Sequence, residues 1–449
     1  MKAPNYFEPS AIKKISDSDK KLVHIVTIAT KPDIIKQAPI YWELKNRGEL
    51  VLLCHTGQHY DFRYSGGMEE EFGLEVDIHL KIDGNLNQKV AQMIERFGEV
   101  IEYLHSVDKT PIPYIHGDTS TSMAIGLGSF MHRVACCHVE AGIRTLTPKT
   151  TVYQQFYDEF KAGKFDWNTY YEAMQQRENY ELGSMEPYPE QYNTRVSEPA
   201  SGFHAAAVEL DREFMLAEGF DPKTIKVVGN TVADATVAAI ADSEKSTIFK
   251  KYPQLENGEF IRVCIHRREN TQDEQRFIVL IDAMEQLIRD GHSVLLISLF
   301  GTEAAIDEFG LRQRIEGLAK EFPETFIYSD VWPYYRDVIA AMRKCAVVAT
   351  DSGSMQEEMN ILGVPCVTLR FGSDRGESFL AGSNIPAPPI DSKFIVEIIK
   401  GAVNNKDMAS VGNIYGTAVS KKIVDEVLAQ ADDELGLFQT EEKRLQIKS

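Results

Sequence analysis

The sequence predicts an α/β fold with two doubly wound domains. Short apolar runs alternate with longer segments of helical period, which is the pattern of a parallel α/β sheet. The runs are continuously apolar, as expected of strands that are buried on both faces. The chain has 449 residues, too many for one compact core, and its runs fall into two sets of five or six. Each set therefore predicts one domain.

The first domain is expected at residues 21–230, after an N-terminal extension at 1–20 that lacks the apolar core of a signal peptide. Its predicted strands are the runs at 22–30, 49–56, 111–118, 133–140, 202–209 and 224–230. Residues 146–188 interrupt this rhythm, because they are rich in Tyr, Phe, Glu and Gln and lack a buried-strand pattern. We expect them to form a helical insertion in the first domain, either beside a binding site or as a surface decoration.

The second domain is expected at residues 231–410. Its predicted strands are the runs at 260–266, 292–299, 325–330, 345–352 and 364–370. The remaining residues, 411–449, are expected to form a helical segment that packs back on the N-terminal domain.

Composition places the chain among ordinary globular proteins, with 43% hydrophobic and 26% charged residues. No run of about 18 apolar residues predicts a membrane span. The net charge of −19, from 48 basic and 67 acidic residues, argues against nucleic-acid binding, which depends on neutralising phosphates. The six cysteines form no C-x-x-C pair, so we expect buried thiols in a cytoplasmic protein and neither a metal site nor a disulfide.

Two carboxylates follow successive predicted strands. Asp118 stands in "HGDTSTS" and Glu140 in "HVEAGIRT". Ligands of open α/β sheets bind beyond the carboxyl ends of the strands, and adjacent carboxylates there suit removal and return of a proton. The alternatives are structural: Asp118 would cap a helix, and Glu140 would pair with a helix dipole.

Cations follow the first strand of each predicted domain. Lys31 and Lys36 lie in "ATKPDIIKQAP", either near an anion at a helix N-terminus or on the surface. No G-x-G-x-x-G or Walker sequence accompanies them. His266 and Arg267 lie in "CIHRREN", where Arg suits phosphate recognition and His could protonate or stabilise a leaving phosphate oxygen.

The stretch "TDSGSMQEEMN" predicts a strand-to-helix turn with small residues, at Ser352, Gly353 and Ser354. Such a turn lets backbone N–H groups approach a diphosphate, although a plainly capped helix is the alternative. Glu358, about two turns into the helix, could accept from ribose hydroxyls. The next loop, "RFGSDRGES", adds Arg370, Arg375 and Glu377.

At these residues the sequence resembles the UDP-N-acetylglucosamine 2-epimerase family. The matching stretches occur in the same order over nearly the whole chain: "TKPDIIKQAP", "QHYD" (58–61), "HGDTSTS", "HVEAGIRT", "GNTVAD" (229–234), "HRREN", "TDSGSMQEE" and "LGVP". The resemblance implies the glycosyltransferase-B fold, with two Rossmann-like domains facing across a cleft and the nucleotide chiefly on the second domain.

The resemblance also implies a reaction. The C2 proton of the sugar is removed and UDP is eliminated, giving a 2-acetamidoglucal. UDP is then either returned with C2 inverted, or released with N-acetylmannosamine. Asp118 and Glu140 match the acid–base carboxylates, His266 matches the histidine near the diphosphate, and Lys36 matches the first-loop lysine. Ser352, Gly353, Ser354 and Glu358 match nucleotide contacts.

The sequence departs from the family pattern in four places. Lys31 stands where the family usually has Arg, which keeps the charge but loses the bidentate fork. The Pro-Glu-Glu-x-Asn-Arg segment is best matched by "PEQYNTR" (189–195), with Glu190 followed by Gln191 and the Arg displaced to Arg195. Gly-Ser replaces Gly-Gly in "DSGSMQEE", and "RFGSDRGES" replaces a Thr-Glu-Arg-Pro-Glu-type loop. We therefore expect Glu190 to substitute for the third carboxylate, or that step to be altered.

The sequence thus predicts a UDP-sugar 2-epimerase, an isomerase that acts on UDP-GlcNAc or a related 2-acetamido sugar without a metal or cofactor, as a homodimer. The alternatives are a hydrolysing 2-epimerase, a UDP-sugar glycosyltransferase and a non-catalytic nucleotide-sugar-binding protein. The pair Asp118 and Glu140 favours the epimerase, and Gln191 speaks against it.

Overall fold

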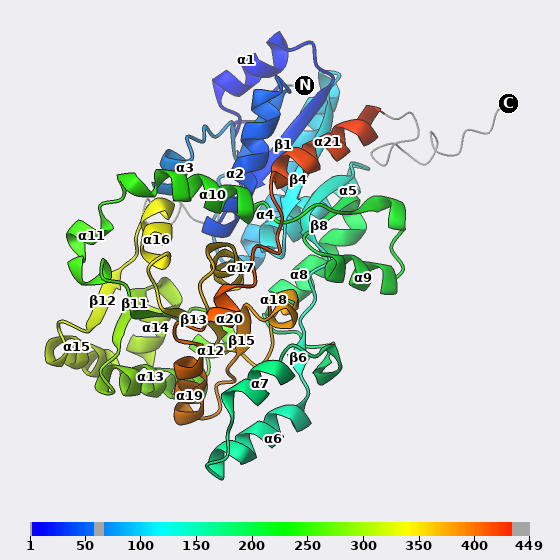
Figure 1. The fold of residues 1–449 in the computed structure, drawn as a ribbon. Helices are drawn as coiled ribbons and strands as arrows, with labels where there is room; N and C mark the ends of the chain where they lie inside the picture. Colours follow the sequence, from blue (N-terminus) through cyan, green and yellow to red (C-terminus); the bar gives the residue numbers. More distant parts are fainter. Residues whose placement is uncertain (1, 58–66, 433–449) are drawn as a thin grey trace. The chain divides into compact units, whose positions relative to one another are not determined.

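Two parallel β-sheets organise the chain, and each apolar run named above contains one of their strands (Figure 1). The computed structural model describes residues 2–57 and 67–432, so the "QHYD" motif and residues 433–449 lie outside it. The chain divides into two compact units. The first takes its residues from Met1–Ile143, Pro189–Ala235 and Tyr415–Ser449, and the second from Arg144–Tyr188 and Thr236–Ile414.

The sheet of the first unit has the strand order β3-β2-β1-β4-β5-β8-β9 and is parallel throughout. Its strands are nearly all buried, as their continuous apolar character predicts. The strands are β1 (Leu22–Ile28), β2 (Val51–His55), β3 (Ile78–His79), β4 (Thr110–His116), β5 (Cys136–Ala141), β8 (Ser201–Ala206) and β9 (Ile225–Val227).

Helices of the first unit cover this sheet. They are α1 (Pro9–Asp17), α2 (Lys31–Asn46), α3 (Gly67–Glu71), α4 (Leu86–Ser106), α5 (Ser120–Met131), α8 (Glu190–Ser197), α9 (Glu209–Ala217) and α21 (Val419–Asp432). The N-terminal extension is part of the core, because Tyr6, Phe7, Ala11 and Ile15 are buried with the strands and α4.

The sheet of the second unit has the order β12-β11-β10-β13-β14-β15 and is also parallel. Its strands are β10 (Phe260–Cys264), β11 (Ser293–Ser298), β12 (Phe326–Asp330), β13 (Val347–Thr350), β14 (Cys366–Thr368) and β15 (Asn384–Pro386). The predicted fold class, α/β with two parallel-sheet domains, is confirmed.

The second unit has helices around this sheet and two further helices, α6 and α7, in the 144–188 segment. They are α6 (Thr150–Lys161), α7 (Trp167–Ala173), α11 (Ile248–Lys251), α12 (Arg268–Thr271), α13 (Glu274–Arg289), α14 (Phe300–Glu308), α15 (Arg312–Glu321), α16 (Tyr335–Met342), α17 (Gly353–Leu362), α18 (Gly376–Ala381), α19 (Ser392–Ala402) and α20 (Lys406–Ala409). Across the described residues, no helix combines the length and apolar character needed to cross a membrane.

The insertion belongs to the second unit, whereas the sequence placed it in the first domain. It forms α6, α7 and a small antiparallel sheet of β6 (Thr147–Pro148) and β7 (Tyr180–Glu181). The physical reason is aromatic packing. Phe156 and Tyr170 are buried in the core of the second unit, and Phe160 lies 5.2 Å from the ring of Phe394 in α19.

The chain passes from the first unit to the second after Ala235, within α10 (Val232–Asp242). This boundary is five residues later than the one expected after residue 230. It returns to the first unit at Tyr415, where the sequence placed the start of the last segment at residue 411. There α21 packs against α2, and Arg47 pairs with Asp425 at 2.6 Å.

Candidate active site

The ends of β1, β4 and β5 bring four charged or titratable side chains together in the first unit. The register pairs Val26 with Tyr114 and His116 with Val139, so the carboxyl ends of these parallel strands lie side by side. His116 ends β4 and Glu140 lies in β5, while Asp33 and Lys36 come from the first turns of α2, directly after β1.

Glu140 is the centre of this cluster. Its side chain is 2% exposed, and its Oε2 accepts hydrogen bonds from Lys36 Nζ and, at 2.7 Å, from Asn230 Nδ2. His116 Nε2 lies 3.3 Å from the same oxygen. Three donors thus converge on one carboxylate oxygen in a buried place, where such bonds are strong.

The backbone of Glu140 is strained. Its φ of +63° lies in the left-handed region, which a non-glycine residue rarely adopts. The pairing of β5 with β8 slips in register between Val139 and Ala141, so Glu140 is the extra residue of a β-bulge. Bulges redirect a side chain, often beside active sites, and strain of this kind costs about 1–3 kcal/mol.

His116 links Glu140 to a second carboxylate, because its Nδ1 lies 3.0 Å from Asp33 Oδ1. Burial lowers the pKa of His116, but the carboxylates of Glu140 and Asp33 outweigh this and raise it to about 9. Asp33 also accepts from the backbone N–H of Thr30 at 3.1 Å, as part of the capping box of α2. A positively charged His116 therefore lies between two acids near neutral pH.

Asp118 lies in the turn that follows β4, directly after Gly117. A Cβ added to Gly117 would lie 3.3 Å from Glu140 Oε1, which places this turn against the Glu140 carboxylate. Asp118 is half-buried, and its carbonyl oxygen accepts from Asn193 Nδ2 at 3.0 Å. The helix cap is Thr119, whose side chain accepts from the backbone N–H of Ser122, so Asp118 is not the capping residue.

The other predicted residues of the first unit lie at the starts of helices. Lys31 is the first residue of α2 and is half-buried. Glu190 is the first residue of α8 and is also half-buried. Gln191 is fully buried, and its Oε1 accepts from Arg195 Nη1 at 2.9 Å. Gln191 therefore has a structural role in α8.

Asp351 organises the histidine of the second unit. It is fully buried at the end of β13 and accepts from the backbone N–H groups of His266 and Arg267 at 3.0 Å and from Asn270 Nδ2 at 3.0 Å. The Nδ1 of His266 lies 3.2 Å from Asp351 Oδ1. This contact orients the ring, whose side chain is 30% exposed.

Two guanidinium groups lie at the N-terminus of α17. Ser352 occupies the N-cap position of this ten-residue helix without a side-chain capping bond, and Gly353 and Ser354 follow it. A Cβ on Gly353 would lie 3.5 Å from Arg267 Nη2 and 3.5 Å from Arg375 Cζ. Asp374 Oδ2 would lie 3.4 Å from the same Cβ. A helix N-terminus with adjacent Arg side chains favours a bound anion such as a phosphate.

Acidic side chains hold Arg375 and the neighbouring Arg370 in place. Arg375 pairs with Glu357 and, at 3.1 Å, with Asp374, which also accepts from Arg370 at 2.7 Å. Burial raises the pKa of Asp374, but the cations of Arg370, Arg375 and Arg267 outweigh it and hold that pKa well below its usual value.

Glu358, predicted to contact ribose, is buried in α17. Its Oε1 accepts from the hydroxyl of Tyr335 at 3.2 Å. Glu377 lies in the first turn of α18. The positions of Ser352, Gly353, Arg267 and Arg375 thus agree with one anion site, and Glu358 lies further along the same helix.

Sequence reasoning missed several partners of the residues it named. They are Asp33, His116, Asn230, Asp351 and Asp374. Each stands in a stretch quoted above: "KPD", "HGD", "GNT", "TDSG" and "SDR". Their polar character between apolar strands and helix starts was the available signal.

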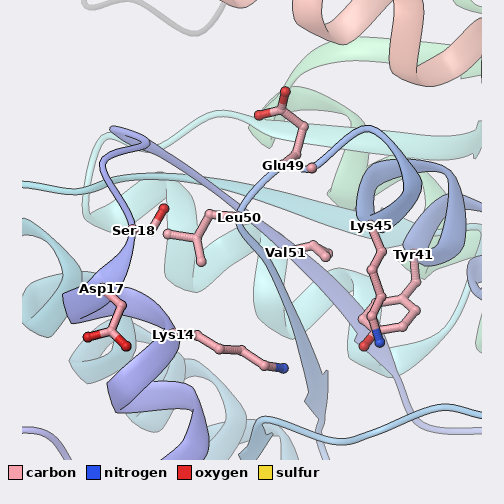
Figure 2. Close-up of a pocket in the computed structure, with 9 residues that line it drawn as sticks. Lys14, Asp17, Ser18, Tyr41, Lys45, Glu49, Leu50 and Val51 are labelled. Carbon is pink, nitrogen blue, oxygen red and sulfur yellow. The ribbon is translucent and has the colours of Figure 1, made fainter.

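A separate pocket of about 320 Å³ lies elsewhere in the first unit (Figure 2). It opens beside Leu50 and Val51, where β2 begins, and is lined by Lys14 and Lys45 among others. The pocket lies at the amino ends of the strands. Because β1, β2, β4 and β5 are parallel, Glu140, near the end of β5, lies at the opposite, carboxyl end of the sheet. The pocket is therefore not part of the candidate site.

Comparison with known families gives a match over most of the chain. The family model described as UDP-N-acetylglucosamine 2-epimerase matches residues 43–159 and 182–429 and leaves out 160–181, within the insertion.

Curated relatives carry the same name. The UDP-N-acetylglucosamine 2-epimerase of Methanococcus maripaludis is 25% identical over 406 residues, covering 89% of this chain and 96% of the relative. The enzyme so named from Neisseria meningitidis is 25% identical over 420 residues, covering 90% and 98%.

Solved structures share the fold. The Methanocaldococcus jannaschii UDP-GlcNAc 2-epimerase, in complex with UDP-GlcNAc and UDP, superposes with a TM-score of 0.73 at 22% identity and covers 91% of this chain and 99% of that one. The Neisseria meningitidis UDP-GlcNAc 2-epimerase bound to UDP-GlcNAc gives 0.71 at 23% identity, with 91% and 100% covered.

Proposed function

The chain belongs to the UDP-N-acetylglucosamine 2-epimerase family, and from this premise we propose that it is a UDP-sugar 2-epimerase. The substrate is UDP-GlcNAc or a related 2-acetamido sugar, and the product differs in configuration at C2. The observation that carries the proposal is the buried carboxylate of Glu140, held by three donors beside the Asp118 turn.

The pair of carboxylates suits the two proton transfers of this reaction. One carboxylate takes the C2 proton, the C1–O bond to UDP breaks with its electron pair, and a 2-acetamidoglucal forms. UDP then adds back to C1, and a proton is delivered to C2 on the opposite face. Glu140, whose Oε2 receives hydrogen bonds from Lys36 and Asn230, would serve as one of these carboxylates, and half-buried Asp118, in the turn after β4, would serve as the other.

The second unit supplies groups that suit the diphosphate. Arg267, Arg375 and the N-terminus of α17 would stabilise the charge that grows on UDP as the C1–O bond breaks. His266, oriented by Asp351, would donate a hydrogen bond or a proton to a phosphate oxygen. In the first unit, Lys36 donates a hydrogen bond to Glu140, and Lys31, the first residue of α2, would bind an anion there.

Gln191 supports a second candidate, a UDP-sugar enzyme that leaves C2 untouched. A glycosyltransferase does not need the third carboxylate that Gln191 replaces. We propose instead that Glu190, one residue earlier on α8, substitutes for it. The return of UDP, rather than its release with N-acetylmannosamine, and the expected homodimer both stay predictions.

Exchange of the C2 proton tests the proposal. The protein is incubated with UDP-GlcNAc in deuterated water, and the sugar is followed by NMR. We expect deuterium at C2 and the appearance of UDP-ManNAc. Glu140→Gln should lower the exchange rate by at least about 100-fold, the usual scale for loss of an acid–base group.

Controls separate the candidates. Glu99→Gln, on the exposed face of α4, should exchange at the wild-type rate. Free N-acetylmannosamine with deuterium at C2 would indicate a hydrolysing enzyme. Transfer of the sugar with hydrogen retained at C2 would contradict the epimerase and favour the transferase.

A further inference from the structure

The segment 144–188 pairs directly with residues 370–378, which comprise the loop after β14 and the first turn of α18 and are called the loop 370–378 below. Leu146 and Ser373 form an antiparallel bridge, with N–H to carbonyl distances of 2.9 Å in both directions. The hydroxyl of Tyr153 in α6 donates to the carbonyl of Phe371 at 2.6 Å. The loop backbone is therefore held by hydrogen bonds from a part of the chain more than two hundred residues earlier.

Two glycines make this close approach possible. A Cβ on Gly376 would lie 2.5 Å from Leu146 Cδ1, and a Cβ on Gly372 would lie 2.5 Å from Thr147 Oγ1 and 2.7 Å from the carbonyl oxygen of Leu146. No side chain fits at such distances, so these positions are matched to the segment that covers them.

The segment is also anchored away from the loop. Tyr157 donates to Asp391 at 3.2 Å, Tyr170 to the carbonyl of Pro386 at 2.7 Å, and Tyr171 to the carbonyl of Gly382 at 2.9 Å. The ring of Tyr170 lies 4.9 Å from that of Phe156 in the core of the second unit. These contacts give the segment a fixed position from which it can hold the loop.

The held loop is the one that carries Arg375. The Oγ of Ser373 accepts from the Arg375 backbone N–H at 2.9 Å and donates to Gln356 of α17 at 2.6 Å. The Arg375 guanidinium in turn lies at Gly353. Leu146 thus fixes the backbone of Ser373, two residues before the arginine of the anion site.

We propose that residues 144–188 are a brace that holds the loop 370–378 in the conformation that binds the diphosphate of UDP. The inference rests on the proposed function, because it names what that loop binds. A loop that is ordered before binding spends less of the binding free energy on ordering, so the brace raises affinity for the nucleotide without touching it. Tyr153, Leu146 and their neighbours are positioning residues.

Two tyrosines of α6 provide a matched test. Tyr153→Phe removes the hydroxyl that holds Phe371, whereas Tyr157→Phe removes one that holds Asp391, away from the loop. UDP binding is measured by calorimetry, and the KM and kcat for UDP-GlcNAc by the epimerase assay. We expect Tyr153→Phe to weaken UDP binding and raise KM by about fivefold with kcat within about twofold, the scale of one hydrogen bond. Tyr157→Phe should leave the affinity within about twofold.

A second pair of variants tests the close packing of Leu146 on Gly376. Gly376→Ala should weaken UDP binding at least about tenfold by displacing Leu146, and the added Leu146→Ala should restore part of the affinity. Equal effects of Tyr153→Phe and Tyr157→Phe on affinity, with UDP bound by the wild type, would overturn the brace alone. A wild type that binds no UDP would overturn the proposed function and the brace with it.

Discussion

A single residue, Glu140, combines three features that rarely occur together. Its backbone is strained, its carboxylate is buried, and its Oε2 receives donors from three separate segments of the chain. A strained backbone and a buried charge persist only where the surrounding structure stabilises them. Here the hydrogen bonds from Lys36, His116 and Asn230 stabilise the carboxylate. Breaking one partner of such a group leaves a charge buried without compensation.

His116 makes stability depend on pH at this site. Its pKa rises from 6.5 to about 9 on folding. The stabilisation is therefore fully present below about pH 6.5 and is lost as the pH rises through about 9. We expect the free energy of unfolding of the wild type to exceed that of His116→Gln by more at pH 6 than at pH 9.5. The pH-dependent part is on the order of 3 kcal/mol, measurable by urea unfolding across this range.

His138 offers a control of opposite sign. Burial lowers its pKa to about 4, so its stabilisation is present above about pH 6.5 and declines as the pH falls. The gap between the wild type and His138→Gln should then widen from pH 5 to pH 8. A His116→Gln gap that stays constant over pH would show that folding does not raise the pKa of His116.

At the scale of the element, neighbouring residues of the stretch "HGDTSTS" have different structural roles. His116 ends β4, Gly117 turns with φ of +59°, and Thr119 caps α5. The backbone N–H of Ser122 donates to the hydroxyl of Thr119 at 3.2 Å, which makes Thr119 the capping residue. The cap therefore accounts for Thr119 and Ser122, and Asp118 is not its capping residue.

Stability measurements can separate these two roles. Thr119→Ala removes the cap and should lower the free energy of unfolding by about 1 kcal/mol. Asp118→Asn leaves the Thr119 cap intact and should change it by less than about 0.5 kcal/mol. Both are measured by urea unfolding at neutral pH. If Asp118→Asn lowered the free energy of unfolding more than Thr119→Ala, Asp118 would have a structural role.

At the scale of the whole molecule, the chain crosses between the two units more than once. Residues 144–188 leave the first unit and join the second, and Tyr415 brings the chain back. Asp234 of α10 secures this return, because it accepts from the backbone N–H groups of Val419 at 3.1 Å and Ser420 at 2.7 Å. An acid from α10 thus caps α21, which packs on α2.

Removing this cap should loosen the returning segment. We expect Asp234→Ala to lower the free energy of unfolding by about 1–2 kcal/mol and to speed hydrogen exchange in α21, measured by mass spectrometry. Asp242→Ala, at the exposed end of the same helix, removes only a surface pair with Lys245 and should cost less than about 0.5 kcal/mol. Similar exchange in α21 for the two variants would show that Asp234 does not hold it.

The sequence by itself determined the strands and the residues at their ends. Continuous apolar runs predicted β1, β2, β4, β5 and β8–β14, because a strand buried on both faces must be apolar throughout. Asp118, Glu140 and His266 stood out as polar residues directly after such runs. β3 (Ile78–His79) and β15 (Asn384–Pro386) were missed, because these short strands include polar residues and do not form a continuous apolar run.

Only the tertiary structure decided which distant residues meet. Lys36 and Glu140 are 104 positions apart, and Leu146 and Ser373 belong to segments whose pairing no local pattern encodes. The same holds for the unit to which the insertion belongs, since its aromatic residues could have packed on either sheet. Local sequence records how deeply a residue is buried, whereas contacts depend on strand order and chain path, which arise only when all the segments pack together.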